Sequence, residues 1–195
     1  MPLPVPNSSA AQWLRGAADH TESLENALPR AYREEGVPDL AELAGHAEAI
    51  DEHHRAVLDI TAVLTARPHP ATAERAEART LAAAAEELAR AGASVSRAAE
   101  MAARLHDVAS VGGRSAEATR EHATRYLNQS LSHTRIALRD ATEQLRTEAT
   151  RLSLATPAGR GPAAVARSTA RGARVVAAPP ARPADLPPHA AGRRR

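Results

Sequence analysis

The sequence predicts an all-α protein: an elongated antiparallel bundle or coiled coil of about four helices, followed by a disordered C-terminal tail. Two observations lead to this prediction. Long alanine-rich segments carry apolar residues at heptad spacing, which is typical of helices that pack along one another. Proline and glycine cluster between these segments and mark the helix ends. We therefore divide the 195 residues into a flexible N-terminus, residues 1–8, an alanine-rich helical bundle, residues 9–154, and a basic tail, residues 155–195.

The first helix is expected over residues 10–28. Ser9 and Gln12 have the spacing of a capping box, which favours a helix start at this point. Pro29 then either ends the helix or begins a short extra turn. Trp13, in the first turns, is predicted to be a buried anchor. The positions expected to face the core recur at steps of three and four: Ala10, Leu14, Ala17, Thr21, Leu24 and Leu28.

The second helix is predicted to begin after Asp39 and to run to about Ala66. Asp39 and Glu42 form another capping signal. The expected core positions alternate at steps of three and four: Leu40, Leu43, Ala47, Ile50, His54, Val57, Thr61 and Leu64. This register places His54 at the core or its edge, and it leaves His53 on a half-exposed face.

Residues 46–59 of this helix, HAEAIDEHHRAVLD, contain three histidines and four carboxylates. Asp51 and His54 form a D-x-x-H pair, and a dimetal bundle requires two such pairs on different helices. No other histidine has an acid three residues before it, so we expect no metal and no cofactor. We interpret His54 as a structural residue that fixes helix register. The alternatives are a metal site at Asp51 and His54, and a partner-binding or pH-sensing role.

The third helix is expected over residues 72–111, ended by Gly112 and Gly113, and the fourth from a Ser115 cap to about Leu154. Two heptad columns follow the third helix: Leu81, Leu88, Val95 and Ala102, with Ala84, Ala91, Ala98 and Leu105. Two more follow the fourth: Leu131, Leu138, Leu145 and Leu152, with Leu127, Thr134, Ala141 and Glu148.

The leucine column of the fourth helix, Leu131, Leu138, Leu145 and Leu152, is a candidate interaction seam. It fits either a seam inside the bundle or a dimer interface. A DNA-binding zipper would need a continuous basic helix before it, whereas the preceding SAEATREHATRY also contains glutamates. Large aliphatic residues are sparse in this chain, so we expect self-association or a helical protein partner to complete the core.

The C-terminal segment is predicted to be a disordered tail. Residues 157–195 hold eight arginines and one acid, a net charge of +7, in an Ala/Pro-rich context that buries little apolar surface. Its candidate polyanion contacts are Arg160, Arg167, Arg171, Arg174, Arg193, Arg194 and Arg195. The alternatives are a purely solvated tail, phosphate contacts that are not sequence-specific, and an anionic membrane surface.

Several function classes are disfavoured by the sequence. The chain has no cysteine, no phosphate-binding loop with its lysine, and no G-x-S-x-G nucleophile motif. No window is apolar enough to span a membrane, and no secretory signal is visible. We expect a cytoplasmic, non-catalytic helical scaffold or adaptor that acts through coiled-coil association. The alternatives are a nucleic-acid-associated accessory protein and, third, a metal-binding helical bundle.

Overall fold

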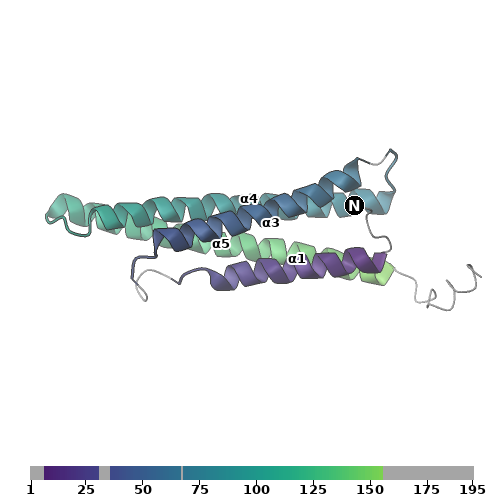
Figure 1. Ribbon diagram of the computed structural model, residues 1–195, viewed down its shortest axis with the longest axis horizontal. Coiled ribbons are helices and arrows are strands. Elements are labelled where there is room, and N and C mark those ends of the chain that lie inside the picture. The colour runs from purple at the N-terminus through teal and green to yellow at the C-terminus, as the bar shows by residue number, and fades with distance from the viewer. Residues whose placement is uncertain (1–6, 31–35, 67, 156–195) are drawn as a thin grey trace, which may run out of the picture. The chain divides into compact units, whose positions relative to one another are not determined.

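The computed structural model describes residues 7–30, 36–66 and 68–155. Within these ranges the chain forms four α-helices and no strand: α1 (Asn7–Ala27), α3 (Leu40–Thr65), α4 (Thr72–Asp107) and α5 (Arg114–Ala155) (Figure 1). This confirms the predicted fold class. The helix expected from residue 10 starts at Asn7, so Ser9 lies inside it. The tail expected from residue 155 lies, apart from its first residue, outside the described residues.

Helix α3 begins where the sequence predicts. The carboxylate of Asp39 accepts a hydrogen bond from the backbone N–H of Ala41 at 3.0 Å, while Asp39 itself is extended, with φ −66° and ψ 134°. The side chain therefore satisfies one of the backbone donors that a helix start leaves without a partner.

The turn between α4 and α5 differs from the prediction at both ends. Helix α4 ends at Asp107, not near residue 111, and α5 begins at Arg114, so Ser115 lies in its first turn. At this end of α4 the guanidinium of Arg120 donates to the carbonyl of Val108 from Nε at 3.2 Å and from Nη2 at 2.8 Å. Gly113, at φ +104°, adopts the left-handed conformation that reverses the chain.

The four described helices form an antiparallel ring. Helix α1 packs on α5, α5 on α4, and α4 on α3, whereas α3 meets α1 along a much shorter stretch. The side-chain pairs between α1 and α5 run in opposite directions: Arg15 near the start of α1 donates to Ser153, and Glu25 near its end accepts from Arg139. The edge between α1 and α3 is therefore the least packed of the four.

The heptad columns predicted for α4 and α5 are buried at every position, and all their apolar members belong to the core. One member of the α5 columns, Glu148, is only 3% exposed. Its carboxylate accepts hydrogen bonds from both Nε and Nη2 of Arg151, the first at 2.8 Å. This bidentate pair provides the compensation that a buried charge requires.

Helix α1 buries the predicted face from Leu14 to Leu24, including the polar Thr21, which is fully buried. Leu28 is buried just beyond the helix end, and Ala10 is only partly buried. Trp13 is only half-buried and packs against the core from its edge, so the prediction of a buried anchor is only partly met. None of the helices in the described ranges has an apolar stretch long enough to cross a membrane.

The predicted core register of α3 is partly wrong. Leu43, Ile50 and Val57 are buried as expected, but the fourth buried residue is His53, not His54, and Leu40 is 38% exposed. The physical reason is that α3 has two neighbours, α4 and α1. A helix in this position buries a wider stripe than the two-column seam of a coiled coil, so a third column, containing His53, is also covered.

Candidate functional site: a helix groove and a buried histidine

An open groove of about 560 Å³ runs between α3 and α4. Both sequence candidates for metal binding, Asp51 and His54, lie in its α3 wall. The groove is lined from α3 by Ala47, Glu48, Asp51 and His54, and from α4 by Leu88, Ala89, Gly92, Ala93 and Ser96. Apart from the buried Leu88, the α4 side consists of small residues, which leave room for a bulky ligand.

The Asp51 and His54 pair does not gain further ligands from its surroundings. The carboxylate of Asp51 forms an ion pair with Arg55, one turn further along α3. Within residues 7–30, 36–66 and 68–155, no group of three or more His, Asp or Glu side chains is placed to share a metal ion. What the two residues do share is the wall of the groove.

Gly92 adds no side chain to the α4 wall of this groove. A Cβ atom added at this residue would meet only Cγ2 of Ile50, at 3.7 Å, which is an ordinary van der Waals contact. The packing of α3 on α4 therefore tolerates alanine here. Glycine in the middle of a helix costs about 1 kcal/mol relative to alanine, and this cost is not explained by contacts inside the bundle.

A second groove lies on the other flank of α4, where that helix meets α5. Its lining includes Arg90, Ala93 and Arg97 from α4 and Ile136 from α5. Ile136 is 52% exposed and gives this groove an apolar side chain on its α5 wall. Ala93 lines both grooves. Ala89, Gly92, Ala93 and Ser96 of α4 thus form a ridge of small side chains beside the first groove, and Ala93 also borders the second; we call these four residues the α4 ridge.

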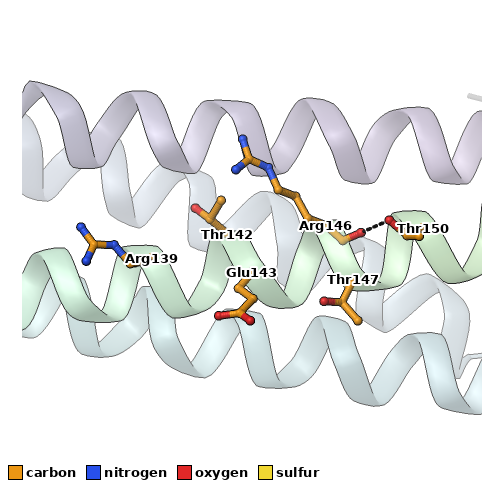
Figure 2. A pocket seen from close by; sticks show the side chains of 6 residues that line it. All are labelled: Arg139, Thr142, Glu143, Arg146, Thr147 and Thr150. Atoms are coloured by element: carbon orange, nitrogen blue, oxygen red, sulfur yellow. Dashed lines mark hydrogen bonds between the residues drawn. The ribbon is translucent and has the colours of Figure 1, made fainter.

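A third groove lies along α5, beside α1, and its charged residues hold these two helices together (Figure 2). Figure 2 shows Arg146 pointing toward α1, where its Nη2 lies 2.6 Å from Glu22 and 3.4 Å from Asp19. Arg139 similarly lies 2.6 Å from Glu25. Exposed pairs of this kind contribute little to stability, because water and salt screen them, so we assign them to the alignment of α1 on α5.

His53 is the buried titratable group at the edge between α3 and α1. The residue is only 7% exposed, and its Nε2 lies 2.9 Å from Oγ1 of Thr21. The hydroxyl of Thr21 donates to the carbonyl of Ala17 at 2.9 Å, so its oxygen accepts from His53. This assigns the tautomer with hydrogen on Nε2. The ring of His20 lies against that of His53, with centroids 4.8 Å apart and planes at 74°.

The pKa of His53 is lowered from 6.5 to about 4. Burial is the main cause, because it removes water from the charged form, and the nearby charge of His20 lowers the pKa further. A hydrogen bond to the backbone of Ala17 acts in the opposite direction. His53 is therefore neutral at physiological pH.

The leucine column that was the candidate interaction seam is buried inside the chain's own bundle. Leu131, Leu138, Leu145 and Leu152 are at most 6% exposed. Their side chains already pack in the core of one molecule, so a partner reaches them only if the bundle opens. The seven candidate polyanion contacts, from Arg160 to Arg195, lie outside the described residues.

Sequence reasoning missed the bond between His53 and Thr21, although both residues gave a signal. Thr21 interrupts an apolar column of α1, and His53 follows Ile50 by three residues, a spacing equally compatible with a heptad core position. Choosing between His53 and His54 required knowledge of the second neighbour of α3. No family model, no curated protein and no solved structure matches this chain.

Proposed function

We propose that this protein is a non-catalytic helical adaptor that holds a partner helix on the α4 ridge. The main supporting observation is that two grooves share the wall residue Ala93, beside a glycine that the internal packing does not require. Insertion of a helix into a groove is a common mode of peptide recognition. The association differs from the predicted one, because it uses the outer face of α4 and not the leucine column of α5.

The chemistry of the ridge indicates what kind of helix fits. Small side chains at Ala89, Gly92 and Ala93 let a second helix approach closely, and close approach increases dispersion contacts. Glu48 flanks the ridge on the α3 side and Arg97 on the α5 side. The partner helix is therefore expected to carry a narrow apolar face, with a basic residue placed to meet Glu48 and an acidic residue placed to meet Arg97.

Affinity capture from native cells, followed by mass spectrometry, tests this function. The wild-type chain is compared with Ala93→Arg, which fills the ridge, and with Ala56→Arg, the same change at an exposed alanine of α3 outside the groove. We expect a partner that is retained by wild type and Ala56→Arg and is lost with Ala93→Arg. Equal capture by all three proteins would contradict a role for the ridge.

A second candidate function rests on charge. Residues 157–195 have a net charge of +7, whereas residues 1–156 have 17 arginines and 22 acids, a net of −5. This asymmetry favours a nucleic-acid-associated accessory protein that contacts phosphates through its C-terminal segment. Nuclease treatment during the capture experiment distinguishes the two functions, because only captured material that depends on nucleic acid is lost. A cytoplasmic location is part of both proposals.

A further inference from the structure

The contact between α1 and α3 differs from the other helix contacts in how it is made. It is the shortest of the four, and a polar bond between two buried side chains, His53 and Thr21, bridges it. The neighbouring contacts do not involve His53: α1 is held on α5 by ion pairs such as Arg139 with Glu25, and α3 lies on α4 with Ile50 against Gly92. One edge of the ring can therefore change independently.

We propose that the α1–α3 edge is an acid-sensitive closure: protonation of His53 separates α3 from α1, while α1 stays on α5 and α3 stays on α4. This inference is independent of the proposed adaptor function, because the α4 ridge lies on the other flank of α3. It concerns a conformational change built into the bundle itself.

The geometry explains why a proton on His53 is not accommodated. The hydroxyl hydrogen of Thr21 already bonds the Ala17 carbonyl, and its oxygen accepts the Nε2 hydrogen of His53. Protonation adds a second N–H, on Nδ1, together with a positive charge in a buried place. The charged group that faces His53 from α1 is His20, which is of the same sign when protonated.

The charged neighbours on the remaining sides do not compensate this charge. On the α4 flank of α3, Asp51 lines the groove and is already paired with Arg55, and Glu52 on α3 is exposed to solvent. A ring with a pKa near 4 instead of 6.5 binds a proton about 300-fold less readily in the closed bundle than in water. If the closed α1–α3 edge is favoured over the open edge by less than this factor at neutral pH, the edge opens as the pH falls from 6.5 to 4.

Spin labels provide a direct test on the full chain, because the sequence contains no cysteine to interfere. One doubly labelled variant carries cysteines at Ser23 on α1 and Ala56 on α3, both exposed. The matched control carries them at Ser23 and at Thr147, an exposed residue of α5. Distance distributions are measured by electron paramagnetic resonance at pH about 7 and about 4.5, with helicity followed by circular dichroism at the same pH values.

We expect the distance between Ser23 and Ala56 to lengthen at the lower pH, with no change between Ser23 and Thr147 and no loss of helicity. Adding His53→Gln to the first pair should keep the distance short, since glutamine retains an N–H donor for Thr21 but does not titrate. Simultaneous loss of helicity would overturn the proposal, because the bundle would then unfold as one unit. An unchanged first distance would overturn it as well.

A second measurement protects the test against a variant that fails to fold. The ring nitrogens of His53 in the wild-type chain are followed by NMR as the pH is lowered. The proposal requires that His53 stays neutral, with hydrogen on Nε2, through its ordinary pKa of 6.5, and that its protonation and the distance change occur over the same lower pH range. Protonation of His53 at its ordinary pKa without any change in the label distance would show that the closed edge accommodates the charge, contrary to the proposal.

Discussion

His53 of α3 donates a hydrogen bond from Nε2 to Oγ1 of Thr21 of α1, over 2.9 Å, and both side chains are buried. The bond joins the two helices that otherwise share the least contact. The imidazole that makes it is neutral, because burial disfavours the charged form. His53 therefore links the stability of this bundle to pH.

Lowering the pH from 6.5 toward 4 should reduce the free energy of unfolding by up to about 3 kcal/mol. In this range the unfolded chain binds a proton at His53 and the closed bundle does not, so stability falls as the pH falls. Above pH 6.5 both states are neutral at His53 and the residue contributes no slope. Urea denaturation across this range measures the effect, and the loss stops growing at the pH where the α1–α3 edge opens.

The matched variant for this measurement is His53→Gln. Between pH 6.5 and 4 its free energy of unfolding should fall less than that of wild type. Carboxylates that lose their arginine partners in acid affect both proteins equally. If the two proteins lose stability in parallel, His53 is not the source of the pH dependence.

Replacing Thr21 by Val should destabilise the bundle by about 1–3 kcal/mol, although the two side chains have nearly the same shape. The substitution leaves the buried N–H of His53 without its acceptor. Thr21→Ser keeps the hydroxyl and removes only a methyl group, so its cost should be near 1 kcal/mol. Thermal unfolding of the two variants, measured side by side, separates the hydrogen bond from the packing. A larger loss for Ser than for Val would refute the role of the bond.

Leu138→Ala and Leu145→Ala should each cost about 2–5 kcal/mol, because both leucines are fully buried in the core. Ile136→Ala on the same helix is the control. Ile136 is 52% exposed, so its truncation should change stability by about 0.5 kcal/mol or less. Denaturant titration of the three variants measures this contrast. A protein indifferent to the two leucine changes would be incompatible with this core.

Gly92→Ala should raise the free energy of unfolding by up to about 1 kcal/mol, since the new methyl group fits beside Ile50 and alanine favours the helix. Gly113→Ala should do the opposite, because Gly113 has φ +104° and alanine is strained there. Melting temperatures of both variants check the prediction. Destabilisation by Gly92→Ala would mean that the fold needs this glycine, which would remove the main support for the α4 ridge.

Full-length protein should bind duplex DNA more tightly than a chain truncated after residue 156, because the net charge of residues 1–156 is −5. Eight arginines neutralise at most about eight phosphates, so the slope of log affinity against log salt should be no steeper than about −7. Binding at two salt concentrations, with two unrelated DNA sequences, measures both the slope and the expected indifference to sequence. If full-length protein ignores DNA at low salt, the nucleic-acid candidate is excluded.

The sequence alone determined the helices and most of the core. The columns of Leu81, Leu88 and Val95 in α4 and of Leu131, Leu138 and Leu145 in α5 repeat every seven residues, and all are buried. A heptad repeat specifies which face of a helix is buried without reference to any other segment, because the period matches the turn of the helix. The helix start at Asp39 could also be predicted from sequence, because an N-cap side chain bonds to the backbone of a residue two positions further along the chain.

Only the tertiary structure decided which histidine of α3 is buried, where α4 ends, and what the leucines of α5 contact. His53 is covered because α1 packs against a third face of α3, and the sequence of α3 alone does not reveal that neighbour. Helix α4 ends at Asp107, and Arg120, twelve residues beyond Val108, donates to the Val108 carbonyl at this end, a contact between two helices that the sequence does not reveal. A column of leucines has the same sequence pattern whether it packs inside one molecule or between two, because the hydrophobic effect depends on the apolar area buried and not on what buries it. Only the placement of the other helices shows that the column is internal here.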